Sequence, residues 1–238
     1  MLVRVGDFYA IGYATNIANE GFQRFSVSHE LGHYFMPGHL EGVLGEGDVH
    51  QSRAGFVSRD RFEQEADHFA ANLLMPKRLF TDALRKTGSG IEGLERLRSL
   101  CGTSMLATAI RYSQCSPDPV AVIVSANGTI DYCFMSPALK DLKGIDWIRK
   151  REGVPRGTPT FEIQRAATAG ISGARIHGTS DLQDWFGGSR SVEITEEVIG
   201  LGRYGKYLTL LYDIEIPDPD DEDDEDALRE SWTPRFSR

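Results

Sequence analysis

The sequence has few cysteines and lacks any long apolar run, and both features narrow the class of protein. Its three cysteines in 238 residues form neither an even set nor a CxxC pair, which argues against a disulfide framework. No stretch reaches the roughly 20 apolar residues that a membrane-spanning helix requires. Arg4 and Asp7 interrupt the first residues before the apolar segment of a secretory signal can develop. We therefore expect a cytoplasmic protein with no membrane partner.

Basic residues are also in the minority, with 26 Lys and Arg against 35 Asp and Glu, for a formal net charge of −9. Coating nucleic acid requires clustered basic side chains, so the net charge argues against nucleic-acid coating as the main activity. A local basic groove is still compatible with this net charge. Much of the acidic excess lies in residues 218–226, a run that cannot be buried. We interpret residues 217–238 as an acidic tail.

The hydrophobic periodicity predicts an α+β protein with a helical first part. Helical spacing over residues 22–36 and 61–75 indicates two helices, each ending at a proline, and Ser58 or Asp60 would cap the second. Three shorter helical segments follow, and then two pairs of apolar strand patterns, the first of them around an Asn-Gly turn.

We divide the chain into four parts on this basis. Residues 1–88 form the first helical core, and residues 89–116 form a helical hairpin with the outline of a helix-turn-helix. Residues 117–216 form an α+β module, and the acidic tail follows. The second helix of the hairpin carries only Arg111 as a charged residue, which is a poor match to a helix that must neutralise phosphates. A structural hairpin is therefore the favoured interpretation.

The sequence His29-Glu-Leu-Gly-His33 is an HExxH pentapeptide on a predicted helix. Residues at i and i+4 project from one helix face, so the two imidazoles can converge on a single metal ion. Glu30 lies beside them, placed to take a proton from a water molecule. A zinc site also needs a third protein ligand and an open position. His39, ten positions after His29, is one candidate, but Met36 stands where the metzincin pattern has glycine.

RFSVSHELGHYF, followed about thirty residues later by FEQEADHFAANLLMP, resembles the ImmA/IrrE family of metallopeptidases. The resemblance covers residues 8–80 strongly and the rest only in outline. It implies a zincin-like core of the gluzincin type, in which a Glu on the second helix completes the zinc site. Glu63 is the preferred ligand, with Asp67 four residues later orienting a ligand histidine. Glu65 is the alternative, ahead of His39.

The resemblance further implies a regulated zinc endopeptidase that cleaves a specific protein, a helix-turn-helix repressor, in a stress or phage-related response. The alternative function is a metal-binding transcriptional regulator or scaffold without proteolysis. In the peptidase, Glu30 would remove a proton from the attacking water and return it to the leaving amine. Three side chains that the sequence does not rank are candidates to stabilise the oxyanion: Tyr34, His50 and His177.

Two weaker hypotheses concern regulation. The module over residues 117–216 resembles the GAF-like sensor domain of some IrrE-like proteins, and Trp147 and Trp185 are as compatible with a ligand pocket as with the core. Cys101, at a bend between two helices, is a candidate inhibitory fourth ligand, because a thiolate can replace the catalytic water. An inert thiol is the simpler interpretation of Cys101.

Overall fold

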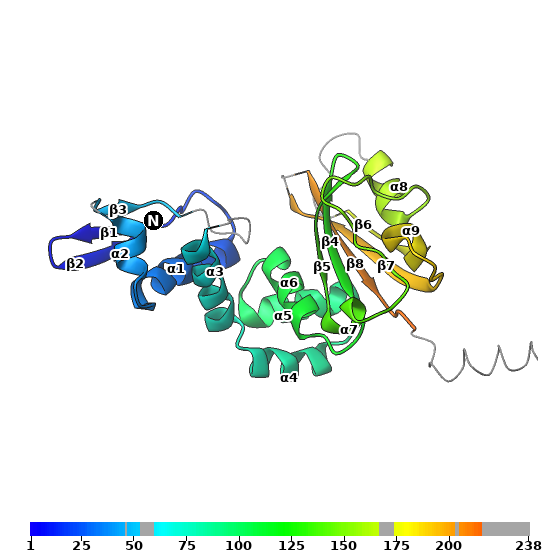
Figure 1. Cartoon of the computed structure of the whole chain (residues 1–238), viewed down its shortest axis with the longest axis horizontal. Coiled ribbons are helices and arrows are strands. Elements are labelled where there is room, and N and C mark those ends of the chain that lie inside the picture. Colours follow the sequence, from blue (N-terminus) through cyan, green and yellow to red (C-terminus); the bar gives the residue numbers. More distant parts are fainter. Residues whose placement is uncertain (46, 53–59, 167–173, 203–204, 216–238) are drawn as a thin grey trace, which may run out of the picture.

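The computed structural model describes residues 1–45, 47–52, 60–166, 174–202 and 205–215. Among these residues the fold is mixed α+β with two antiparallel sheets. The amino-terminal elements lie at one end of the molecule and a five-stranded sheet lies at the other, with three helices between them (Figure 1). The acidic run over 218–226 lies outside the described residues. No described helix has the length and apolar character needed to cross a membrane.

The first part consists of a small sheet and three helices. Strands β1 (Leu2–Val5), β2 (Phe8–Ile11) and β3 (Val49–His50) form the sheet in the order β2-β1-β3. Helices α1 (Glu20–Phe35), α2 (His39–Leu44) and α3 (Arg61–Leu74) pack beside it. The helical periodicity therefore predicted α1 and α3 correctly, but it did not reveal the sheet.

Caps fix where α1 and α3 begin. The Asn19 side chain accepts a hydrogen bond from the backbone of Phe22 at the start of α1. Asp60 does the same for Phe62 and Glu63 at the start of α3, which confirms one of its two predicted caps. The other, Ser58, lies outside the described residues.

The two helices lie in close contact at Gly32, the fourth residue of the pentapeptide. A Cβ atom there would lie 3.1 Å from Cα of Ala66 and 3.2 Å from Cβ of Phe69 on α3. Ordinary contact between carbon atoms is about 3.5–4.0 Å. Glycine at this position therefore allows α3 to lie directly against the face of α1 that carries the histidines.

Three helices connect this part to the large sheet: α4 (Lys77–Thr87), α5 (Gly90–Cys101) and α6 (Met105–Cys115). They share one hydrophobic core with strands of that sheet, including Leu94 and Leu97 on α5 and Leu208 and Leu210 on the last strand. The hairpin over residues 89–116 is thus built into the core.

The contacts of helix α6 favour a structural role for this hairpin over DNA binding. Most of its side chains are buried, and its one charged residue, Arg111, is turned inward. The Arg111 guanidinium donates to the backbone oxygen of Met75 at 3.0 Å and to the side-chain oxygen of Asn72 at 2.7 Å. A recognition helix would present such a residue to phosphates instead. The structural interpretation of the hairpin is therefore the one that the contacts support.

The large sheet has the order β5-β4-β8-β7-β6, and all of its neighbouring strands are antiparallel. Its strands are β4 (Ala121–Ala126), β5 (Thr129–Met135), β6 (Arg175–Asp181), β7 (Glu193–Gly200) and β8 (Lys206–Tyr212). The β4–β5 hairpin turns at Asn127 and Gly128, both with positive φ, as the Asn-Gly signal predicted. The pairing of β7 with β8 is also as predicted, whereas β6 was not foreseen.

Helices cover both faces of this sheet. On the face opposite α5 and α6 lie the short helices α8 (Pro159–Ala166) and α9 (Leu182–Phe186), and α7 (Pro137–Lys140) follows β5 (Figure 1). Trp185 of α9 is a core residue whose indole donates to Glu196 at 2.9 Å. Trp147 is largely exposed. Trp185 is therefore accounted for as a core residue, and the sensor-like role of this module stays a prediction.

Candidate metal centre

Helix α1 carries His29, Glu30 and His33 on its buried side. The helical repeat brings the two imidazoles together with their rings 4.7 Å apart, and their Nε2 atoms lie 3.0 Å from each other. Both nitrogens therefore point to the same place, as the i and i+4 spacing predicts.

Helix α3 brings Glu63 to that place. Oε2 of Glu63 lies 3.4 Å from Nε2 of His29, and Oε1 lies 3.3 Å from Nε2 of His33. A tetrahedral zinc ion with ligand bonds of about 2.0–2.1 Å has ligand atoms about 3.3–3.4 Å apart along each edge. The nitrogen–nitrogen separation of 3.0 Å and the oxygen–nitrogen separations of 3.3 and 3.4 Å are near this length. The two oxygen–nitrogen separations involve different oxygens of Glu63, either of which could be the ligand atom.

The donor set also fits a zinc ion chemically. His29, His33 and Glu63 are buried, and among the residues described they form a group whose ligand atoms lie within 4.8 Å of one another. Oε2 of Glu63 and Oε2 of Glu30 are buried without a hydrogen-bond partner, and such oxygens are costly unless a cation or water meets them. Two imidazole nitrogens and one carboxylate oxygen are a known ligand set of catalytic zinc.

The electrostatics keep one ligand ready for metal. The pKa of His33 is lowered to about 3, mainly by burial and then by the neighbouring His29, His50 and His39 in that order. A metal ligand must be the neutral imidazole, so a low pKa leaves His33 available at ordinary pH.

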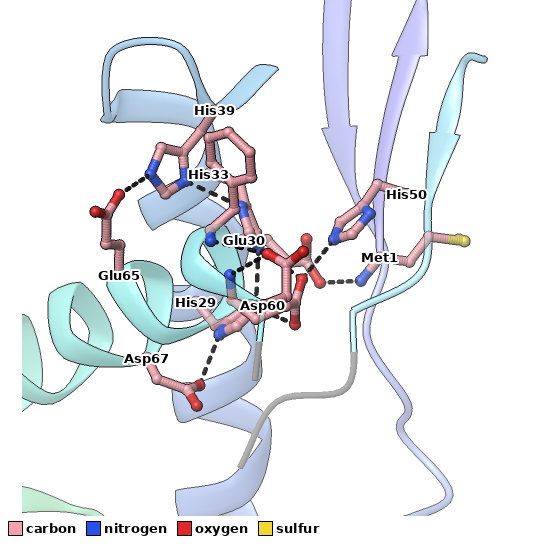
Figure 2. A network of polar contacts seen from close by, with 11 residues as sticks. Met1, His29, Glu30, His33, His39, His50, Asp60, Glu65 and Asp67 are labelled. Atoms are coloured by element: carbon pink, nitrogen blue, oxygen red, sulfur yellow. Dashed lines mark hydrogen bonds and ion pairs between the residues drawn. The ribbon is translucent and has the colours of Figure 1, made fainter. Parts of the chain in front are cut away.

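Asp67 holds the other nitrogen of His29. Its Oδ1 lies 2.8 Å from Nδ1 of His29, four residues beyond Glu63 on the same face of α3 (Figure 2). A carboxylate in this position accepts the Nδ1 proton and thereby keeps Nε2 free for a metal. The arrangement is the one expected for Asp67.

The two alternative third ligands are not part of the ligand group. His39 turns its Nδ1 toward Nδ1 of His33 at 3.2 Å, and its Nε2 lies 3.0 Å from Oε2 of Glu65 (Figure 2). Both residues therefore lie behind His33, on the side away from Glu63. Among the three candidates for the third ligand, the structure brings only Glu63 to the Nε2 atoms of the two histidines.

Glu30 lies beside the ligand group on the side of the small sheet. Its Oε1 contacts the amino group of Met1, which also donates to the backbone oxygen of Gly12 at 3.1 Å (Figure 2). The Glu30 side chain is almost wholly buried. The Glu30 carboxylate therefore lies close to the candidate metal position. A general base that takes a proton from a metal-bound water must be in such a place.

The structure separates the three candidates for oxyanion stabilisation. His50 ends β3 and reaches the centre, with its Nε2 2.9 Å from Oε1 of Glu63. Tyr34 is partly exposed and its ring packs on Tyr9, while His177 lies on β6 of the large sheet. The sequence could not rank His50 above the other two, because its position results from the pairing of β3 with β1, which sets His50 opposite Leu2.

Cys101 is not part of the group either. It ends α5 and lines a pocket with Leu74, Pro76 and Leu79, packed against the core that α4, α5 and α6 share with the sheet. Burial raises the pKa of its thiol, which disfavours the thiolate that a metal would bind. The structure gives no support to Cys101 as a fourth ligand, and the inert-thiol interpretation accounts for its surroundings.

Comparison with known proteins adds a family match. Residues 7–113 match the model of the Peptidase_M78 family, described as the IrrE N-terminal-like domain. No match was found among curated proteins. A solved structure of a Mycobacterium tuberculosis transcriptional regulator is similar with 15% identity and a TM-score of 0.44, over 80% of this chain. The chain spans 63% of that regulator's length, and a likeness this distant carries no argument about function.

Proposed function

We propose that this protein is a zinc-dependent endopeptidase, because its residues 7–113 match the IrrE N-terminal-like domain of the M78 peptidase family. The observation that carries the proposal is the buried group of His29, His33 and Glu63, whose ligand atoms all lie within 4.8 Å of one another, as the protein ligands of a zinc ion must. Zinc held there would polarise a water molecule and the carbonyl of a peptide bond.

The side chains around the group have separate tasks in this proposal. Glu30 takes the proton of the attacking water and later gives it to the leaving amine. Asp67 keeps His29 in the tautomer whose Nε2 is free. His50, the one oxyanion candidate at the centre, donates a hydrogen bond to the oxygen on which negative charge develops.

The substrate class comes from the resemblance to ImmA/IrrE metallopeptidases. We propose that the physiological substrate is a protein, specifically a helix-turn-helix repressor, cleaved in a stress or phage-related response. The rival is a metal-dependent regulator or scaffold that does not cleave. Glu30 favours the peptidase, because a scaffold needs the metal ligands but has no use for a buried carboxylate without a hydrogen-bond partner on Oε2.

The two functions are separated by Glu30→Gln, which keeps the size and shape of the side chain and one accepting oxygen but removes the base. The assay incubates zinc-loaded protein with a helix-turn-helix repressor whose gene neighbours the gene of this protein. New fragments are followed by mass spectrometry. We expect wild-type protein to cleave and the variant to be at least about 100-fold slower, with zinc content unchanged. Equal cleavage by both proteins would refute the proposed mechanism, and cleavage by neither would favour the scaffold.

A further inference from the structure

A series of hydrogen-bonded side chains leads from His33 to the protein surface. Nδ1 of His33 lies 3.2 Å from Nδ1 of His39, whose Nε2 lies 3.0 Å from Oε2 of Glu65. Oε1 of Glu65 accepts a hydrogen bond of 2.7 Å from Nε of Arg61. The histidines are buried and Arg61 is exposed, so the series runs from the buried centre to the surface. Figure 2 shows its part from His33 to Glu65.

The positions of the protons in this series follow from the chemistry of its members. A hydrogen bond between two imidazole nitrogens requires one to carry the proton and the other to accept it. If Nε2 of His33 is a metal ligand, its proton is on Nδ1 and is donated to Nδ1 of His39. His39 then carries its own proton on Nε2, which faces Glu65, and an ionised carboxylate can only accept. Every proton thus has a single position compatible with a metal at His33.

We propose that His39 and Glu65 are positioning residues that hold His33 in its metal-binding tautomer and ring orientation. Asp67 orients His29 through a direct contact with its Nδ1. His39 contacts Nδ1 of His33 in the same way, and Glu65 in turn orients His39. This inference rests on the metal site of the proposed function. Without Glu65, His39 could carry its proton on Nδ1 and donate it to His33. His33 would then hold its proton on Nε2, the atom that must be free for metal.

The fold holds His39 in place for this task. Gly38 adopts a φ of 79°, a left-handed conformation that favours glycine, and α2 begins at the next residue. The ring of Phe62 packs edge-on against His39 with centroids 5.0 Å apart. A Cβ at Gly42 would lie 2.4 Å from that Phe62 ring, so glycine lets the ring approach α2. The imidazole of His39 is therefore preorganised by packing as well as by Glu65.

The test measures the zinc affinity of the purified full chain by chelator competition. His39→Leu removes the acceptor for His33, and we expect affinity to fall about 10- to 100-fold, as for other residues that orient a metal ligand. In His39→Asn the side-chain oxygen attaches to the same carbon as Nδ1 of histidine and can accept the same hydrogen bond. That variant should recover most of the lost affinity. His68→Leu, at an exposed histidine on α3, is the matched control and should bind like wild type.

Two spectroscopic readouts separate positioning from ligation and from general damage. Proton NMR of the zinc-loaded protein should show the Nδ1–H of His33 as a hydrogen-bonded, slowly exchanging signal in wild type and a faster-exchanging one in His39→Leu. The visible absorption spectrum of the cobalt-loaded protein should indicate the same ligand set in wild type and in His39→Leu. A cobalt spectrum that loses a nitrogen ligand in His39→Leu would make His39 a ligand and overturn the positioning role.

The outcomes distinguish this inference from the proposed function. If wild-type protein binds no zinc, the proposed function fails. If it binds zinc and both His39→Leu and Glu65→Ala bind equally well, only the positioning role is wrong. Should His39→Leu fail to fold, Glu65→Ala decides the question, because the Glu65 side chain is 32% exposed and tolerates truncation more readily.

Discussion

Replacing Gly32 with alanine tests whether the contact between α1 and α3 sets the geometry of the metal centre. The added Cβ would lie 3.1 Å from Cα of Ala66 and 3.2 Å from Cβ of Phe69, and neither atom can turn away on a flexible side chain. Restoring ordinary contact requires the helices to separate by about 0.3–0.5 Å. Zinc sites tolerate deviations of only about 0.2 Å in ligand distance. Zinc binding must therefore pull the helices back together against the overpacked contact.

The magnitude follows from the cost of overpacking, typically about 1–3 kcal/mol. If the metal-free protein relaxes and the zinc-bound protein cannot, this cost is subtracted from the binding free energy, and the Kd for zinc rises about 5- to 150-fold. The gain in helix propensity from glycine to alanine, about 1 kcal/mol, offsets part of the strain in the metal-free protein. Its thermal stability should therefore change much less than its affinity for zinc.

The assay compares zinc affinity and metal-free Tm of Gly32→Ala with those of Gly153→Ala. At Gly153 the nearest atom to an added Cβ is 4.0 Å away, so the same substitution meets open space and should leave both quantities unchanged. If Gly32→Ala bound zinc as tightly as wild type, the close approach of α1 and α3 would not be what sets the ligand spacing.

Two further predictions concern stability. Arg111→Met removes the hydrogen bonds to the Met75 carbonyl and the Asn72 amide, and we expect the free energy of unfolding in urea to fall by about 2–4 kcal/mol. An unchanged midpoint of the urea unfolding curve would contradict the structural role of Arg111. The folded metal-free chain keeps His33 neutral down to a pKa of about 3, whereas an unfolded histidine takes up its proton near pH 6.5. The unfolded state therefore binds more protons between these values. The contribution of His33 to stability is fully present above about pH 6.5 and falls as the pH is lowered toward 3, so the Tm of metal-free protein should depend less on pH in His33→Asn.

Much of this molecule could be predicted from the sequence where a local pattern carried the information. The helices that bear His29 and Glu63 followed from hydrophobic spacing, caps and flanking prolines, because these signals act within one or two turns. The β4–β5 hairpin followed from Asn127 and Gly128, which accept the left-handed conformations of its turn.

The parts that were not predicted depend on contacts between distant segments. β3 has two residues, and only its pairing with β1 makes it a strand and brings His50 to the centre. β6 is an edge strand that contains Gly178 and has no apolar run, so its sequence resembles a loop. His39 faces Glu65, 26 residues further along the chain, and no spacing rule specifies such a side-chain partner.

The most direct test of the metal centre is X-ray absorption at the zinc edge of the zinc-loaded protein. We expect the zinc to be bound by two imidazole nitrogens and one carboxylate oxygen from the protein, with a further light atom from solvent and no sulfur. Glu63→Ala should lose the carboxylate and most of the bound zinc, because one of three protein ligands is gone. A sulfur scatterer would identify a cysteine ligand such as Cys101. A third imidazole would identify His39 or His50, and either result would contradict the ligand set of His29, His33 and Glu63.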